Sequence, residues 1–225
     1  MISILLNSIY TATCISCDLL FEFSWQNCFC SSCIDSIKKE NNLIYCRSCG
    51  NGVYNCQRCL NKRYFKDIQV FCSYKGVVKD LIYEYKLNGK KRLSKILAEK
   101  IKDDFTRFIK EKNIDMVAYV PVHKSVEKER GFNHLREILN NIIPSYMIFD
   151  GIKKIKNTKL QTQLTKKERE KNLKDAFTLD KLPKAENIVI FDDVLTTGST
   201  IMEIYKTLRK AKYNGNIYGY IITKS

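Results

Sequence analysis

The sequence predicts an α/β fold in which a mostly parallel sheet carries helices on both faces and follows a small cysteine-rich, zinc-binding segment. From residue 65 onward, short apolar runs of strand length alternate with longer stretches of helical periodicity. Nine of the ten cysteines of the 225-residue chain lie before residue 60. We therefore expect a cysteine-rich segment over residues 1–64 and one α/β domain over residues 65–225.

The cysteine-rich segment contains four pairs of cysteines, each with two residues between them. Each pair can present two thiolates from a tight turn, and two pairs complete a closed tetrahedral zinc site that leaves no catalytic position. Because the segment has few large apolar residues, bound zinc would supply much of its folding free energy. The predicted zinc ligands are Cys14, Cys17, Cys30 and Cys33, followed by Cys46, Cys49, Cys56 and Cys59.

The spacing of these cysteines leaves several alternatives open. An interleaved pairing of the same eight residues fits as well, and so does one zinc ion in place of two. Iron–sulfur ligation by four cysteines is the other chemistry to consider. Cys28 is either a spare ligand or a packed thiol, whereas Cys72 stands in an apolar run and is expected in the core.

The domain alternates strands and helices along the chain. Strands are expected over residues 68–74, 115–120, 146–149, 188–191 and 217–222. Helices are expected over residues 77–87, 93–108 and 135–143, and after Gly198 as far as residue 212. Residues 153–174 are basic and lack apolar periodicity, so we expect an excursion or a mobile loop there.

One strand, loop and helix carry the strongest functional signal. The apolar run 188–191 ends in Asp192 and Asp193, and a hydroxyl-rich loop leads into an amphipathic helix. Loop amides and a helix N-terminus together hold phosphate, and a glycine lets the backbone approach the anion. Carboxylates at the carboxyl end of a strand suit sugar hydroxyls or an ion-bridged diphosphate. The predicted phosphate-binding residues are Thr196, Thr197, Gly198, Ser199 and Thr200.

The net charge of +15 favours polyanions as partners, because Lys and Arg outnumber Asp and Glu by 39 to 24. A generally lysine-rich composition explains the same excess, so the charge supports nucleic-acid binding only weakly. No stretch approaches the roughly 20 apolar residues of a membrane helix, and the N-terminus lacks the basic region of a signal peptide. We expect no membrane span, a cytoplasmic location, and cysteines that bind metal rather than form disulfides.

Residues 188–200 resemble the ribose-phosphate signature of type I phosphoribosyltransferases. The resemblance implies that residues 196–200 wrap the 5′-phosphate of phosphoribosyl pyrophosphate (PRPP), that Asp192 and Asp193 face the ribose hydroxyls, and that Mg²⁺ accompanies the diphosphate.

The order of the remaining motifs resembles the ComF family (ComFC, also called GntX-like) over almost the whole chain. After the cysteine pairs come Val120-Pro121-Val122-His123, Arg130-Gly131-Phe132-Asn133, Gln161-x-x-Leu164, Arg169-x-x-Asn172 and Ala176-Phe177. The resemblance adds Lys86, His123, Arg130 and Arg169 to the PRPP-binding residues, with Asn133, Gln161 and Asn172 at further polar positions of the family's loops. Two positions depart from the family pattern: His134 replaces the usual Gln, and Tyr119 replaces the first of two prolines.

The ComF resemblance implies a cytoplasmic protein of natural transformation, with other competence proteins as potential partners. We expect a PRPP-binding, phosphoribosyltransferase-like protein that handles incoming single-stranded DNA, with Tyr45, Tyr54 and Tyr64 either stacking on bases or packing on the domain. The alternative is an active phosphoribosyltransferase of nucleotide metabolism with an unidentified acceptor. No acceptor pocket can be recognised in the sequence, and the catalytic residues stay unknown.

Overall fold

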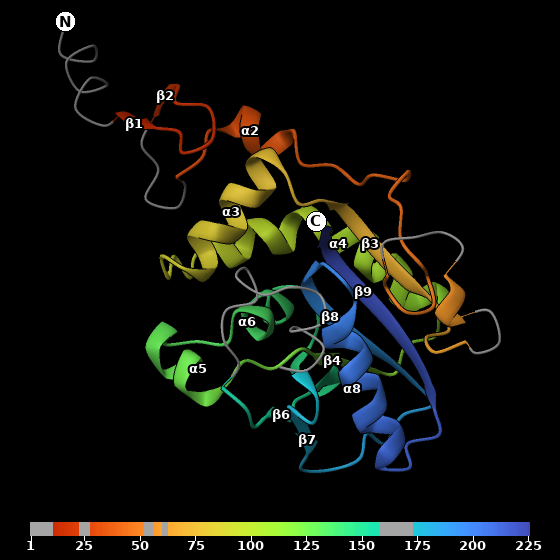
Figure 1. Cartoon of the computed structure of the whole chain (residues 1–225). Coiled ribbons are helices and arrows are strands. Elements are labelled where there is room, and N and C mark those ends of the chain that lie inside the picture. The colour runs from red at the N-terminus through yellow and green to blue at the C-terminus, as the bar shows by residue number, and fades with distance from the viewer. Residues whose placement is uncertain (1–10, 23–27, 52–55, 60–62, 158–172) are drawn as a thin grey trace, which may run out of the picture.

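The computed structural model describes residues 11–22, 28–51, 56–59, 63–157 and 173–225. Its centre is a sheet with the strand order β3-β9-β8-β4-β5, in which every neighbouring pair runs parallel (Figure 1). The strands are β3 (Ile68–Ser73), β4 (Met116–Tyr119), β5 (Ile148–Phe149), β8 (Asn187–Leu195) and β9 (Asn216–Lys224). The predicted α/β fold is confirmed.

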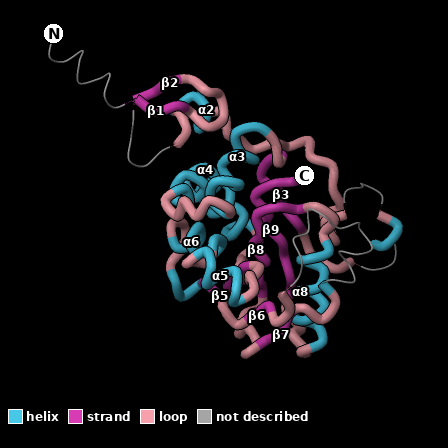
Figure 2. The backbone as a smooth tube through the Cα atoms, turned by 60° about the vertical axis from the view of Figure 1, so that its left-hand side comes forward, coloured by secondary structure: helices cyan, strands magenta, loops and turns pink. Residues whose placement is uncertain are grey.

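Helices cover both faces of this sheet, as predicted. They are α3 (Gly76–Lys86), α4 (Leu93–Glu111), α5 (Lys124–Arg130), α6 (His134–Asn140) and α8 (Ser199–Lys210). Figure 2 shows α4 and α6 on one side of the strands and α8 on the other. No helix in the described part of the chain is long and apolar enough to cross a membrane.

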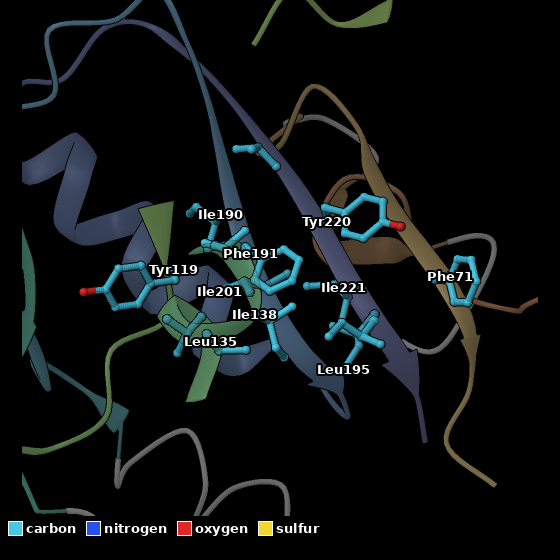
Figure 3. Packing of buried hydrophobic residues seen from close by; sticks show 14 of the residues in the cluster. Phe71, Tyr119, Leu135, Ile138, Ile190, Phe191, Leu195, Ile201, Tyr220 and Ile221 are labelled. Carbon is cyan, nitrogen blue, oxygen red and sulfur yellow. The ribbon is translucent and has the colours of Figure 1, made fainter. Parts of the chain in front are cut away.

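The core is centred on β8, whose residues 188–191 are fully buried because helices cover the sheet on both sides. The rings of Phe191 and Tyr220, on neighbouring strands, stack with centroids 6.0 Å apart. Phe105 of α4 packs against both rings, at 5.3 Å and 4.6 Å between centroids. Figure 3 shows side chains of β8, β9 and α6 gathered in this core.

Several elements differ from the sequence prediction. β8 does not end at Phe191 but continues through Asp192 and Asp193, because its pairing with β9 extends to Leu195. The 3₁₀ turn Ser145–Met147 shortens β5 to two residues. The helix α5 was not expected, because Val126 is its one apolar residue and gives no periodicity.

The excursion expected over residues 153–174 begins and ends in an antiparallel pair of short strands, β6 (Ile152–Lys154) and β7 (Phe177–Leu179). Residues 158–172, which include Gln161, Arg169 and Asn172, lie outside the described residues. The predicted roles of these three residues therefore stay predictions.

The cysteine-rich segment contains little regular structure. Its described elements are β1 (Thr11–Thr13) and β2 (Leu20–Glu22), which pair antiparallel, the helix α2 (Ser31–Asp35) and the 3₁₀ turn Gln57–Cys59. Phe65 is fully buried and packs on Tyr205 of α8, with ring centroids 5.5 Å apart. The division of the chain at residue 64 stays a prediction.

Candidate phosphate site and metal centres

The hydroxyl-rich loop lies where a parallel sheet places its ligands, between the carboxyl end of β8 and the first turn of α8. Gly198 has a left-handed backbone with φ of 73° and begins the helix without a side chain to cap it. Thr197 Oγ1 lies 2.7 Å from Ser199 Oγ, and the Ser199 amide donates to Thr197 Oγ1 over 3.4 Å. Since the first amides of a helix have no partner within the helix, this loop has the geometry of an anion site.

Asp193 is buried beside the loop and is held by two side chains from other elements. Its Oδ2 accepts from His134 Nε2 over 2.7 Å and pairs with Lys86 Nζ at 2.9 Å. Burial opposes ionisation of Asp193, but Lys86 and His134 outweigh it and hold the pKa of this carboxyl well below its usual range. Asp193 is therefore an anion at neutral pH.

His134 connects this carboxylate to Arg130, because its Nδ1 lies 2.9 Å from Arg130 Nη1. A guanidinium only donates, so Nδ1 accepts and Nε2 carries the proton given to Asp193. Burial lowers the pKa of His134 to about 4 despite the attraction of Asp193, so the ring is neutral. Lys86, Arg130, His134 and Asp193 form a connected group, which we call the Asp193 cluster.

The pKa of Asp192 shifts in the opposite direction from that of Asp193. Burial and the charge of Asp193 together raise the pKa of Asp192 to about 8, although Lys86 and Lys154 partly oppose the shift. Its Oδ1 accepts from the Asp193 amide over 2.9 Å. The pair thus places one anion and one carboxyl that is largely protonated at neutral pH beside the hydroxyl-rich loop of residues 196–200, which we call the phosphate loop.

The remaining described loop residues serve as helix caps. His123 Nδ1 accepts from the Ser125 amide over 3.3 Å at the start of α5. Asn133 Oδ1 accepts from the Arg136 amide over 3.1 Å at the start of α6. Gly131, with φ of 81°, ends α5 and turns the chain from Arg130 into α6.

Sequence reasoning anticipated Lys86, Arg130 and Asp193 as members of one site but gave no role to His134. The signal was present, because His134 stands where the resemblance expects Gln. A buried histidine that joins Arg130 to Asp193 explains why a different polar side chain occupies that position.

Eight cysteines form two clusters, and within each cluster all four Sγ atoms lie within 4.8 Å of one another. Nearest Sγ pairs are 3.7 Å for Cys17–Cys30 and for Cys46–Cys59, and 3.5 Å for Cys49–Cys56. A zinc ion with Zn–S bonds of about 2.3 Å needs sulfur atoms about 3.8 Å apart, so both clusters fit zinc. The first cluster is Cys14, Cys17, Cys30 and Cys33, and the second cluster is Cys46, Cys49, Cys56 and Cys59.

This grouping confirms the sequential quartets over the interleaved alternative. Burial opposes ionisation of Cys14, but amide donors from Cys30, Ser16 and Cys17 outweigh it and lower the pKa of its thiol to about 6, which favours the thiolate that a metal requires. Cys28 belongs to neither cluster. Cys72 is buried in β3 with its thiol 3.6 Å from the Ile222 carbonyl oxygen, as expected for a core cysteine.

Comparison with known proteins places these features in context. No family model matches the chain. "Competence protein F" of Haemophilus influenzae is 30% identical over 200 residues, which cover 82% of this chain and 86% of that protein. "DNA utilization protein YhgH" of Escherichia coli K12 is 26% identical over 80% of this chain and 83% of its own length. "Competence protein ComFC" of Bacillus subtilis is 26% identical over 86% of this chain and 87% of its own length.

Proposed function

This chain belongs to the competence protein F family, and from that premise we propose that it acts in DNA uptake as a cytoplasmic, PRPP-binding protein that handles incoming single-stranded DNA. The names of its relatives, two of which are called competence proteins and one a DNA utilization protein, support the role in DNA uptake. PRPP binding has separate support in the chemistry of the site.

The observation that carries PRPP binding is the position of the loop 196–200 beside two buried carboxyl groups at one end of β8. The amides at the start of α8 and the hydroxyls of Thr197 and Ser199 would bind the 5′-phosphate. Asp192 and Asp193 would bind the ribose hydroxyls. Arg130, Arg169 and Lys86 would neutralise the diphosphate, and Mg²⁺ would supply further positive charge there.

Thermal unfolding with and without PRPP and Mg²⁺ tests this site. A ligand that binds only the native state stabilises it by about 2.7 kcal/mol when present at 100 times its Kd. We expect a rise in Tm for the full chain, a smaller rise for Thr197→Ala, and an unchanged response for the control Thr178→Ala on β7. An unchanged Tm at millimolar PRPP would rule out the PRPP assignment.

DNA handling has its best structural support in a basic cleft at the amino ends of the strands, away from the phosphate loop. The cleft encloses about 420 Å³, and Asp67 is the one acidic residue among its described walls. Its other lining residues are Arg47, Arg63, Lys66, Lys112 and Tyr218. Lysine and arginine around an accessible aromatic ring suit a phosphate backbone with stacked bases.

Tyr45 and Tyr64, two described tyrosines of the cysteine-rich segment, take part in packing instead. Tyr45 Oη accepts from the Val70 amide over 3.1 Å, and the Tyr64 ring packs edge-on against Tyr205 at 5.6 Å between centroids. Tyr54 lies outside the described residues. This packing moves the proposed DNA contact from those rings to the basic cleft.

Fluorescence anisotropy of labelled oligothymidylate against salt concentration tests the cleft. Each phosphate contact in a single strand contributes about −0.7 to the slope of log affinity against log salt. Arg63→Gln with Lys66→Gln should therefore flatten the slope by about 1.4, whereas Lys124→Gln with Lys128→Gln on α5 removes the same charge and should change it little. Equal effects of the two double variants would assign binding to net charge alone.

Phosphoribosyl transfer to an acceptor is the second candidate, and the raised pKa of Asp192 favours it. Burial raises the pKa of Asp192 to about 8, so only its ionised fraction at neutral pH would act as a base. That fraction is a stronger base than an ordinary aspartate and would accept the acceptor's proton as the bond between C1 and diphosphate breaks. Diphosphate release from PRPP against a panel of bases and nucleic acids tests turnover. Binding without release would favour the first function.

A further inference from the structure

The second cluster holds a tight turn whose backbone faces the phosphate loop. Within this turn the Gly50 amide donates to the Cys46 carbonyl over 2.8 Å, and the Cys46 amide donates to the Asn51 carbonyl over 2.6 Å. Gly50 has a φ of 74°, a conformation in which side chains other than glycine are strained. Cys49 is fully buried at the point where this turn meets the domain.

Gly50 and Gly198 pack directly against each other through their backbones. A Cβ atom on Gly198 would lie 2.3 Å from the Cys49 carbonyl oxygen and 3.0 Å from the Gly50 carbonyl carbon. A Cβ atom on Gly50 would lie 2.8 Å from Leu195 Cδ1 and 3.4 Å from Gly198 Cα. The cysteine turn is therefore the surface on which the phosphate loop rests, with no room for a side chain between them.

Further contacts, toward the amino end of β3, also fix the second cluster to the domain. The Ser48 carbonyl accepts from the Phe65 amide over 2.9 Å. Arg47 donates to both carboxylate oxygens of Asp67, over 2.7 Å and 2.6 Å. Because these residues lie between Cys46 and β3, a metal that fixes Cys46 and Cys49 would also fix the backbone beneath Gly198.

The first cluster also consists of four thiols, but it contacts different parts of the domain. Its described contacts with the domain go to α3 and α4: Ser16 Oγ donates to Asp80 Oδ2 over 2.8 Å, and Lys100 pairs with Asp35 at 2.9 Å. Figure 1 shows β1, β2 and α2 beside α3, at a distance from α8. The first cluster is therefore a matched control for the second, because loss of its metal should leave the phosphate loop unchanged.

We propose that the second cluster is a positioning element of the phosphate loop, so that metal bound there sets the conformation of residues 196–200 and the affinity for the phosphate ligand, whereas metal in the first cluster does not. The ligand half of this inference rests on the proposed PRPP site. The conformational half depends only on the contact between Gly50 and Gly198.

The experiment compares Cys59→Ser with Cys17→Ser in the full-length chain. Each variant should lose one zinc ion by elemental analysis. Hydrogen exchange of the amides of residues 196–200, measured without ligand, should become at least tenfold faster in Cys59→Ser and stay within twofold of the parent in Cys17→Ser. PRPP affinity by calorimetry should fall at least tenfold in Cys59→Ser only.

The outcomes separate this inference from the proposed function. If the parent chain does not bind PRPP, the proposed function fails, and the exchange measurement still tests the coupling. If Cys59→Ser loses zinc while exchange and affinity stay unchanged, or if both variants change them equally, the inference is overturned.

A second pair of variants serves if Cys59→Ser does not fold. Gly50→Ala keeps all four thiols but would press on Leu195, whereas Gly76→Ala shares a positive φ and has open space around its Cβ. Faster exchange over residues 196–200 in Gly50→Ala alone supports the coupling. Equal exchange in the two glycine variants contradicts it.

Discussion

The first cluster lies against α3 and α4, whereas the second lies against the phosphate loop, although both consist of two pairs of cysteines with two residues between the members of each pair. A set of ligands therefore does not define what a structural metal site does. In the first cluster, metal would stabilise a small appendage that has little core of its own. In the second, the same chemistry would stiffen a backbone on which a binding loop rests.

The comparison gives a physical reason for the glycine in the phosphate loop. In many phosphate sites glycine is needed on the ligand side, where the backbone approaches the anion. At Gly198 the limit on the other side is as severe, because the Cys49 carbonyl oxygen occupies the place of a Cβ atom. The loop therefore packs tightly against the cysteine turn, on the side opposite its proposed ligand.

Gly198→Ala is the change with the largest expected effect, because it separates the loop from the second cluster. The new Cβ would lie 2.3 Å from a backbone oxygen, so the loop must move. We expect PRPP affinity to fall more than about 100-fold, or about 2.7 kcal/mol, with zinc content unchanged. Calorimetry and elemental analysis measure the two quantities.

Gly89→Ala is the matched control for that substitution. Gly89 also has a positive φ, of 62°, but nothing lies within 4 Å of its Cβ position. Backbone strain of about 1–2 kcal/mol is then the whole cost, and PRPP affinity should stay unchanged. A loss of affinity as large as that of Gly198→Ala would show that strain, and not the contact with Cys49, explains both.

The pH dependence of stability gives a further test of the comparison. Low pH protonates the thiolates of both metal clusters, and it also acts on the Asp193 cluster. Unfolded His134 binds a proton below its ordinary pKa of about 6.5, whereas burial lowers the pKa in the folded state to about 4. Between these values His134 binds more protons in the unfolded state, so its contribution to the free energy of unfolding falls as pH falls. The slope of this contribution approaches about 1.4 kcal/mol per pH unit in the window and vanishes below it. Asp192, whose pKa burial raises to about 8, contributes a slope of the opposite sign, so the His134 part is measured as a difference between the parent and a variant.

His134→Gln should remove that part of the acid slope and leave the part caused by zinc release, which both clusters share. Urea unfolding between pH 7 and pH 4, with released zinc followed by an indicator, measures the two parts. NMR titration of the parent identifies the ring by the signals lost in the variant. A ring that titrates near 6.5 in the folded protein would contradict the buried, neutral assignment.

The sequence predicted those parts of the molecule that depend on local pattern. The apolar run 188–191 and the following helix are unambiguous, and the spacing of the cysteines identified both clusters. The short strands β6 and β7 were not predicted, because each has only three residues and is too short to show an alternation of apolar and polar side chains. In β6, two of the three residues are lysines. The extension of β8 through Asp192 and Asp193 was not predicted either, because two charged residues after an apolar run usually mark the end of a strand. Only the pairing with β9 shows that the strand continues.

The contact between the second cluster and the phosphate loop and the contact between His134 and Asp193 could not be predicted, because each depends on residues far apart in the sequence. Nothing local to Gly50 indicates that it faces Gly198, and nothing in the order of motifs brings His134 against Asp193. Glycines with positive φ are predictable from turns. Which backbone lies opposite each glycine is a property of the packed sheet and its helices.

The smallest expected difference concerns the ion pairs that fasten each cluster to the domain. Arg47 donates two hydrogen bonds to Asp67, whose side chain is 10% exposed, whereas Lys100 pairs with Asp35, whose side chain is 74% exposed. Arg47→Met leaves a buried carboxylate with one fewer partner and should lower the free energy of unfolding by about 1–2 kcal/mol. Lys100→Met removes a solvent-screened pair and should cost less than about 0.5 kcal/mol.

Denaturant unfolding in excess zinc measures both losses, and the response to salt distinguishes their origins. The cost of Lys100→Met should vanish at 1 M salt, where charges are screened within about 3 Å, while most of the cost of Arg47→Met should remain. Arg47→Met should also speed hydrogen exchange at residues 196–200 slightly, because it loosens the turn beneath Gly198. Equal losses in the free energy of unfolding for the two variants would mean that the two ion pairs stabilise their clusters equally. The contact between Gly50 and Gly198 would then be what distinguishes the second cluster from the first.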